Sequence, residues 1–217
     1  MEALVARIRE RARGREPYVI VTYAQSLDGS IGTVGDRLLL SGEASTALTH
    51  ALRRECDAIA VGVGTALADD PRLTVRVPNE PPNQPAAIVF DSNGRLPPNA
   101  RLFGSGRRVV VFTARPLALP GTEVVVVPAD PGGLDLRAAI EALGRMGIRS
   151  IMVEGGARII ESFVAAGLAD DLLVTVAPRL VGGIRPQFQG SRHIHDPVYL
   201  PLGQDFVVYG QLRSRRR

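Results

Sequence analysis

The sequence predicts an α/β protein of three layers, in which helices cover both faces of a mainly parallel sheet. Short runs rich in β-branched residues alternate with segments whose apolar residues recur at helical spacing, which is typical of chains built from βαβ units. The first run, YVIVTYA at 18–24, has the composition of a buried strand. With 217 residues, of which 45% are hydrophobic, the chain is long enough for one domain with a substantial core.

The expected elements follow in chain order. Helices are expected over residues 2–15, 43–56, 135–146 and 156–166, and strands over 18–24, 58–63, 86–90, 107–112, 123–127, 149–153, 172–177 and 205–212. In the first helix Leu4 and Ile8 share one side, and in the second Leu48 and Leu52 do so. Ser41 is expected to cap the second helix. The last strand is expected to close the sheet as an antiparallel edge.

Two irregular segments interrupt this order. Residues 78–85 (PNEPPNQP) have no apolar periodicity and are expected to form an exposed loop. Residues 183–201 are expected to be irregular, as a lid or an interface segment. Because no repeat, linker or change of composition divides the chain, we expect one domain over 1–217, with a basic helix at 1–16 and a basic tail at 213–217.

The composition excludes several kinds of chemistry. All 26 basic residues are arginine, and both Schiff-base enzymes and P-loop proteins need a lysine. Cys56 is the only cysteine, which excludes an internal disulfide and a cysteine-rich zinc site and indicates a reducing compartment. No apolar run approaches the ~20 residues that cross a bilayer, and the charged start MEALVARIRE lacks the apolar stretch of a signal peptide. A cytoplasmic protein without membrane contact is expected.

The net charge of +4 arises at the two ends of the chain. Nine arginines lie within the first sixteen and the last five residues, and the rest of the chain carries slightly more acids than arginines. Nucleic-acid binders usually combine a basic face with stacking aromatic residues, but aromatics make up only 5% of this chain. Nucleic acid is therefore not an expected partner.

Ligand-binding residues are expected where the strands end, because open parallel sheets bind ligands at the carboxyl ends of their strands. Ser26, Asp28 and Gly29 follow the first strand. A hydroxyl, a carboxylate and a glycine at this place can hold a polar ligand, although a capped turn explains them more simply.

A glycine pair follows the second strand. Gly62 and Gly64 let the backbone approach a phosphate or a sugar closely, and Thr65 adds a hydroxyl. Leu67 stands where the dinucleotide-binding fingerprint has its third glycine, so the segment is not that fingerprint. Asp69 can cap a turn.

Polar residues also follow the third strand. Asp91, Ser92 and Arg95 can hold a ribose or its phosphate, and the fork of an arginine suits an adenosine 2′-phosphate.

The most specific segment is Val153-Glu154-Gly155-Gly156-Ala157, where a strand passes through two glycines into a helix. The amides at that helix N-terminus form an anion site, and the small residues let a pyrophosphate lie against the backbone. Glu154 would repel a phosphate and is expected to face a substrate hydroxyl or amine. The four segments together predict a phosphate-bearing nucleotide cofactor and a polar small molecule.

The same segments resemble the pyrimidine reductases of riboflavin biosynthesis. The matching segments are SLDG at 26–29, LR at 52–53, GTALADDPRLTVR at 64–76, DS at 91–92, VEGGA at 153–157 and APRLVGG at 177–183. The resemblance implies a dihydrofolate-reductase-like fold, a homodimer, and an NADPH-dependent reduction of the ribosylamino side chain of a pyrimidine 5′-phosphate to the ribitylamino form. The chain lacks the zinc signature of the deaminase half of the bifunctional enzymes, so only the reductase half is expected.

The resemblance and the strand-end segments together give the expected site. The cofactor-binding residues are Ala24, Gly62, Gly64, Thr65, Asp69, Ser92, Arg95, Gly155, Gly156, Ala157 and Arg158. The substrate-binding residues are Ser26, Asp28, Arg53, Leu73, Arg76 and Glu154. No lysine is needed, because opening of the ribose ring supplies a C=N bond within the substrate. The proton is expected from Asp28 or Glu154, with Asp28 preferred and water as the rival.

Two other functions remain open at this point. One is a reductase of another pterin or pyrimidine on the same fold, and the other is a non-catalytic nucleotide- or RNA-binding protein that uses the basic ends. His193 and His195 lack further ligands in sequence, so no metal site is expected. His50 is expected to be a partly exposed helix residue, and Cys56 a core residue.

Overall fold

The structure, a computed structural model, describes residues 2–33, 35, 38–77 and 80–212. Its helices are α1 (Glu2–Arg11), α2 (Glu43–Arg54), α3 (Val63–Asp69), α4 (Leu136–Arg145) and α5 (Ala157–Ala165), with a 3-10 helix η1 (Arg101–Ser105). Its strands are β1 (Tyr18–Ser26), β2 (Ala58–Gly62), β3 (Ala86–Phe90), β4 (Val109–Thr113), β5 (Glu123–Val126), β6 (Ala129–Asp130), β7 (Gly133–Leu134), β8 (Ser150–Val153), β9 (Asp171–Ala177), β10 (His195–Leu202) and β11 (Asp205–Gln211). The basic tail 213–217 lies outside the described residues.

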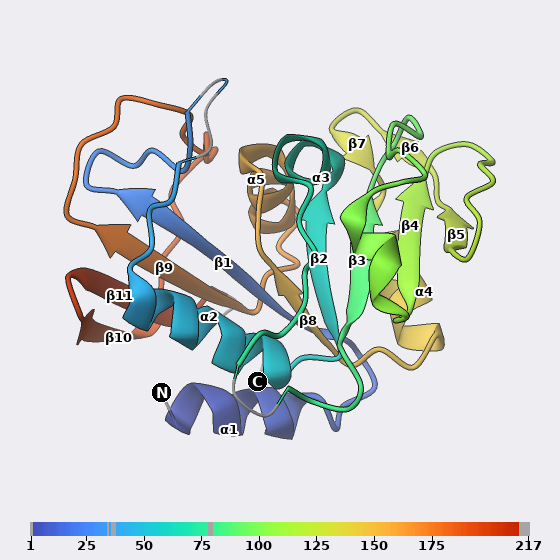
Figure 1. The fold of residues 1–217 in the computed structure, drawn as a ribbon. Coiled ribbons are helices and arrows are strands. Elements are labelled where there is room, and N and C mark those ends of the chain that lie inside the picture. The colour runs from blue at the N-terminus through green and yellow to red at the C-terminus, as the bar shows by residue number, and fades with distance from the viewer. Residues whose placement is uncertain (1, 34, 36–37, 78–79, 213–217) are drawn as a thin grey trace.

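Nine of these strands form one sheet in the order β10-β11-β9-β1-β8-β2-β3-β4-β5 (Figure 1). Every pair from β9 to β5 is parallel, whereas β11 runs antiparallel to β9 and β10 antiparallel to β11. The predicted mainly parallel sheet with an antiparallel C-terminal edge is therefore confirmed.

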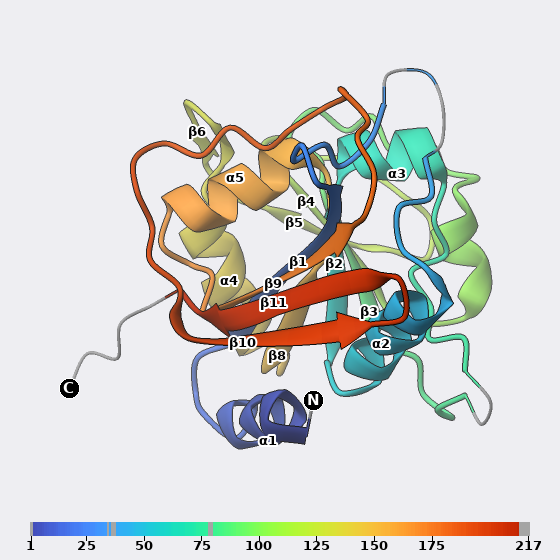
Figure 2. The same cartoon turned by 90° about the vertical axis from the view of Figure 1, so that its left-hand side faces the viewer.

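Helices cover both faces of the sheet. Successive residues of a strand point to opposite sides, so each buried strand packs against helices on both faces. Val19 and Val21 of β1 pack in the cluster that contains α4 and α5. Ile20 between them packs with residues of α1 and α2 on the other face. On that second face α3 and η1 cover β2, β3 and β4, as Figures 1 and 2 show. The three-layer prediction is confirmed.

The edge strand differs from its prediction. The segment expected to be irregular contains β10, which forms the edge, and β11 lies second from the edge. Pro197 and Pro201 obscure this strand in the sequence, but an edge strand tolerates proline because one side of its backbone needs no partner. Alternate residues of β10, Val198 and Leu200 among them, pack against the core.

Two helix starts also differ from their predictions. Ser41 does not cap α2, whose N-cap residue is Gly42 and has no side-chain cap. Instead, the Asp205 carboxylate at the start of β11 accepts hydrogen bonds from the Gly42 N–H (2.8 Å) and from the Ser45 hydroxyl (2.6 Å). The strand expected over 58–63 ends at Gly62, and α3 begins at Val63 with Gly62 as its N-cap. No helix of the described residues is long and apolar enough to cross a membrane.

Candidate active site

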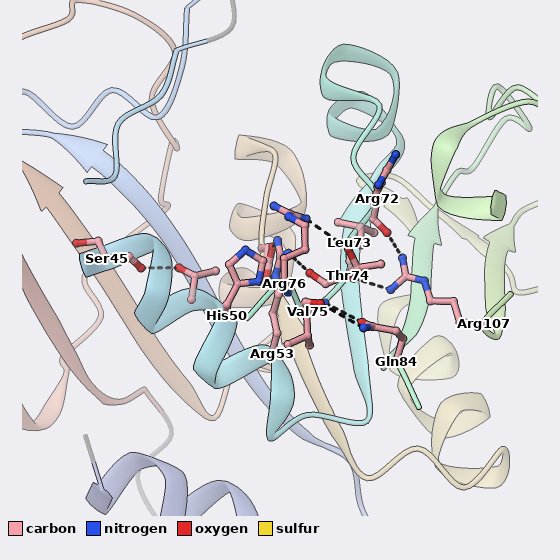
Figure 3. A network of polar contacts seen from close by, with 12 residues as sticks. Ser45, His50, Arg53, Arg72, Leu73, Thr74, Val75, Arg76, Gln84 and Arg107 are labelled. Atoms are coloured by element: carbon pink, nitrogen blue, oxygen red, sulfur yellow. Dashed lines mark hydrogen bonds and ion pairs between the residues drawn. The ribbon is translucent and has the colours of Figure 1, made fainter. Parts of the chain in front are cut away.

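The four polar segments lie together at one edge of the sheet. They follow β1, β8, β2 and β3, which are neighbours in that order, and all four strands are parallel. The loop 70–77 and the C-terminal part of α2 lie beside them on one face (Figure 3). Most expected site residues therefore lie in one region, although several have other contacts than expected.

The two glycines after β8 lie against the first turn of α3. The Gly62 N–H donates to the Gly155 carbonyl (3.4 Å), which holds the two strand ends side by side. Gly156 has φ +83, and a Cβ atom built on it would lie 2.8 Å from the Thr65 Oγ1. Since the N-cap of α5 is Gly156, which has no side chain to cap the helix, the first amides, those of Ala157 and Arg158 among them, lack an intrahelical acceptor. This arrangement suits a phosphate group.

The other expected cofactor residues lie at the ends of neighbouring elements and differ in their exposure to solvent. Ala24 is half-buried in β1, where it pairs with β9. Gly64 and Asp69 are exposed on α3. Ser92 is half-buried beside β7, since a Cβ on Gly133 would lie 3.6 Å from its hydroxyl.

The loop after β3 is stabilised by a buried carboxylate. Asp91 is fully buried, and its Oδ2 accepts the Leu96 N–H (2.8 Å). Arg95 has 53% of its side chain exposed, and its Nε lies 3.8 Å from Asp91 Oδ1. Asp91 therefore shapes the loop, whereas Arg95 has a guanidinium that is open to a ligand.

Arg53 and Glu154 form a two-pronged ion pair at the end of β8. The Arg53 Nε and Nη2 donate to the Glu154 Oε1 (2.6 Å) and Oε2 (2.5 Å), and Nη1 donates to the Thr74 carbonyl (2.7 Å). Because both oxygens of Glu154 accept these donors, the carboxylate directs no proton towards a substrate. The structure thus argues against Glu154 as the proton donor.

His50 lies one turn before Arg53 on α2 and is buried, with 5% exposure, which corrects the expectation of a partly exposed residue. Its Nδ1 accepts the Arg76 N–H (3.1 Å), so the ring proton is on Nε2. Burial, followed by the positive charges of Arg53 and Arg76, lowers the pKa of His50 to about 4. This residue was missed as part of the site, because a histidine within a helix gives no signal of its surroundings.

A group of cations forms around this histidine (Figure 3). Burial and the nearby charges of Arg53 and Arg72 lower the pKa of Arg76, while Glu154 opposes them. The side chains of Arg72 and Arg76 are exposed. Arg53 and Arg76 near one carboxylate, with Arg72 beside Arg76, leave a net positive charge, which suits an anionic group such as a phosphate.

Leu73 was expected to bind the substrate, but its side chain is directed into the core. It is 2% exposed, has φ +53, and packs with α3 and β2. Its carbonyl accepts Nη1 of Arg107 (2.5 Å). The Leu73 side chain is therefore not presented to a ligand, and contact of this residue with the substrate stays a prediction.

Asp28 was the preferred proton donor, and its contacts contradict that role. Its two oxygens accept hydrogen bonds from the Ser26 hydroxyl (2.5 Å), the Val181 N–H (2.9 Å), the Gly182 N–H (2.8 Å), the Ser30 hydroxyl (2.9 Å) and the Arg185 guanidinium (2.7 Å). These bonds, with that of the Ser26 hydroxyl first and that of the Val181 amide next, hold the pKa of Asp28 well below its ordinary range. The contacts of Asp28 favour its ionised form, and they hold the segment 181–185 against β1. Ser26 is fully buried beneath it, and its contact with a substrate stays a prediction.

Two other candidates gain no role. The rings of His193 and His195 lie 5.2 Å apart, and the described residues contain no cluster of three or more His, Cys, Asp or Glu side chains that could hold a metal ion. Cys56 is buried, and burial raises the pKa of its thiol far above the ordinary value.

The fold and the position of the site define the class of protein. The structure is similar to dihydrofolate reductase from Enterococcus faecalis, with a TM-score of 0.50 and 14% identity over 90% of this chain and 97% of that one, a likeness of fold alone. The chain is thus a dihydrofolate-reductase-like α/β protein with a polar site at the carboxyl ends of its strands.

The chain belongs to the RibD C-terminal domain family, which matches residues 17–201. It is 41% identical over 210 residues to the 2,5-diamino-6-ribosylamino-4(3H)-pyrimidinone 5′-phosphate reductase of Methanothermobacter thermautotrophicus, a match that covers 88% of this chain and 96% of that protein. The structure of the riboflavin biosynthesis reductase Rib7 of Saccharomyces cerevisiae is similar, with a TM-score of 0.80 and 25% identity over 93% of this chain and 92% of that one. The riboflavin biosynthesis protein RibD of Aquifex aeolicus is 32% identical, and the match covers 89% of this chain but only 57% of that protein.

Proposed function

We propose that this protein is an NADPH-dependent reductase that converts the ribosylamino side chain of a pyrimidine 5′-phosphate to the ribitylamino form. The reductase from Methanothermobacter, which matches almost end to end, supports this reaction class. The observation that carries the proposal is the pairing of two anion-binding regions on either side of Glu154. One is the cation group of α2 and the loop 70–77, and the other is the Gly155-Gly156 segment that leads into α5.

The cation group is the proposed site of the substrate phosphate. Arg72 and Arg76 have exposed side chains, and the Arg53 guanidinium is oriented by Glu154 and by the Thr74 carbonyl. Charge-assisted hydrogen bonds from arginine to phosphate are among the strongest in proteins. A dihydropterin substrate has no phosphate and would leave these charges without a partner.

The diglycine segment is the proposed site of the cofactor. A Cβ at Gly156 would approach Thr65 to 2.8 Å, so only a glycine leaves this backbone open to a pyrophosphate. The first amides of α5 and the Thr65 hydroxyl would hold the phosphates, and the half-exposed Arg95 would select NADPH by its 2′-phosphate. Bound there, the reduced nicotinamide supplies a hydride.

The chain itself positions the reactants and needs no covalent residue. Opening of the ribose ring moves a proton to the ring oxygen and leaves a C=N bond at the former anomeric carbon. Addition of a hydride to that carbon and of a proton to the nitrogen gives the ribitylamine. Since Asp28 and Glu154 both accept hydrogen bonds with both oxygens, we propose that water delivers the proton.

A homodimer is part of the proposal, because the resemblance to the pyrimidine reductases implies one. Three leucines that are exposed in the single chain, Leu27, Leu39 and Leu180, lie near one another, since the Leu27 N–H bonds to the Arg179 carbonyl and the Arg179 guanidinium to the Leu39 carbonyl. Light scattering that gives the mass of one chain would contradict the dimer. The cytoplasmic location stays a prediction from the sequence.

The reaction is tested by the absorbance of the reduced nicotinamide. The 2-amino-4-oxo pyrimidine phosphate and its deaminated dioxo form are each mixed with NADPH and with NADH, and dihydrofolate serves as the substrate without phosphate. We expect oxidation of NADPH with at least one pyrimidine and none with dihydrofolate. Absence of oxidation with both pyrimidines would overturn the proposal.

A further inference from the structure

The loop 70–77 carries two arginines of the proposed phosphate site but has no helix or strand of its own. Its backbone is held by side chains from other segments. Gln84 brackets Val75, accepting its N–H (2.7 Å) and donating to its carbonyl (3.2 Å). Leu73 adopts φ +53, a conformation that is unfavourable for a residue with a side chain, so the surrounding contacts must stabilise it.

Arg107 is the side chain that binds two different residues of the loop backbone (Figure 3). Its Nη1 donates to the Leu73 carbonyl (2.5 Å) and the Pro85 carbonyl (3.1 Å), and its Nη2 donates to the Arg72 carbonyl. The planar fork of one guanidinium thus binds two successive carbonyls of the loop and one carbonyl of the chain that returns from it. A lysine, which is a single point donor, cannot reproduce this geometry.

The Arg107 guanidinium is held in a position that is unfavourable for a charged group. Arg107 is largely buried, it forms no salt bridge among the described residues, and its Nε has no hydrogen-bond partner there. Burial, helped by the charge of Arg53, lowers its pKa to about 10, which still leaves it charged at neutral pH. A partly buried cation without a carboxylate is costly, and here two of its three hydrogen bonds go to the loop that carries Arg72, while the third goes to the Pro85 carbonyl.

The contacts of Arg107 determine which way the loop faces. The carbonyls of Arg72 and Leu73 turn inward to the guanidinium, and the Leu73 side chain is buried. The side chains of Arg72 and Arg76 then remain exposed, and that of Arg76 lies close to Arg53 and Arg72. We infer that Arg107 is a positioning residue, which holds the loop so that its arginines meet the phosphate of the substrate. This inference rests on the proposed function.

Two variants separate positioning from charge. Arg107→Met removes both the fork and the charge, whereas Arg107→Lys keeps the charge and loses the fork. We expect both to raise the KM for the pyrimidine phosphate by about tenfold or more, the equivalent of one charge-assisted bond, with kcat and the KM for NADPH within about twofold of wild type. If Arg107→Met does not fold, the KM of Arg107→Lys alone decides the test. The matched control is Arg108→Met, which removes the neighbouring arginine and its exposed pair with Glu123.

Two measurements do not depend on turnover. Hydrogen exchange in the free protein is expected to speed up at the amides of Val75 and Arg76 in both Arg107 variants and not in Arg108→Met. Calorimetry with ribose 5-phosphate as the probe is expected to show a similar loss of affinity. A wild-type KM, or unchanged exchange and affinity, in Arg107→Lys would overturn the inference. If the wild-type protein oxidises no NADPH but these two measurements change as expected, the proposed function fails and the role of Arg107 in positioning the anion site stands.

Discussion

Arg53 of α2 and Glu154 at the end of β8 lie 101 positions apart in sequence and form a two-pronged ion pair whose side chains are each only 11% exposed. The pair connects one helix, one strand end and the loop 70–77, because the same guanidinium also binds the Thr74 carbonyl. Glu154 therefore orients a cation of the site.

The first prediction concerns this pair. Glu154→Gln leaves Arg53 buried with no carboxylate, and we expect it to lower the free energy of unfolding by roughly 3–5 kcal/mol. Urea unfolding at neutral pH measures this. The control is Glu123→Gln, which breaks the exposed pair with Arg108 and is expected to cost no more than about 1 kcal/mol. Equal losses in the two variants would contradict the structural role of Glu154.

The second prediction concerns Asp28, which we expect to order the segment 181–185. Asp28→Asn replaces one accepting oxygen by a donor that faces the N–H groups of that segment. We expect faster hydrogen exchange at residues 181–184. We also expect kcat to fall by less than ~100-fold, because removal of a general acid lowers kcat by about 100-fold or more. The high-pH side of the kcat profile, where a general acid loses its proton, should keep its shape, and its disappearance in the variant would restore Asp28 as the acid. Ser30→Ala, which removes one of its donors, should act in the same direction and more weakly.

The sequence predicts the layers, the strand order along the chain and the location of the site, because these depend on local apolar patterns and on where parallel strands end. It does not predict partners that the fold brings from elsewhere. Asp205 caps α2 from a strand more than 150 residues away, and nothing near Ser41 indicates this. Arg107 and Arg108 are adjacent and identical in sequence, yet one holds a loop and the other forms a surface pair.

The roles of Asp28 and His50 show the same limit at the level of chemistry. Residue type alone makes Asp28 a candidate acid, but five hydrogen-bond donors around its carboxylate favour the ionised form. His50 belongs to no sequence motif, and only its contact with the Arg76 N–H shows that it lies beside the site. A protonation state follows from three-dimensional neighbours, which short motifs do not contain.

The third prediction follows from the neutral state of His50. In the unfolded chain its pKa is near 6.5, whereas in the fold it is about 4, so between these values the unfolded state binds the extra proton. Stability from this residue is complete above pH 6.5 and is lost as the pH falls towards 4. His50→Asn keeps an acceptor for the Arg76 N–H and does not titrate. The difference in unfolding free energy between wild type and this variant should shrink or reverse from pH 7 to pH 4.5, and a constant difference would contradict the assignment.

The fourth prediction compares two glycines at the two ends of α5. Gly156 and Gly167 both have positive φ, +83 and +63, but a Cβ at Gly156 would lie 2.8 Å from the Thr65 Oγ1 whereas a Cβ at Gly167 would meet nothing within 4 Å. Each change to alanine carries the conformational cost of about 1–2 kcal/mol, and Gly156→Ala adds the displacement of Thr65. We therefore expect Gly156→Ala to be the less stable of the two and to raise the KM for NADPH strongly, while Gly167→Ala leaves that constant unchanged. Thermal unfolding and initial rates at varied NADPH measure both effects. An unchanged KM for NADPH in Gly156→Ala would mean that the cofactor lies elsewhere, because the added methyl group occupies the space in which the pyrophosphate is proposed to lie.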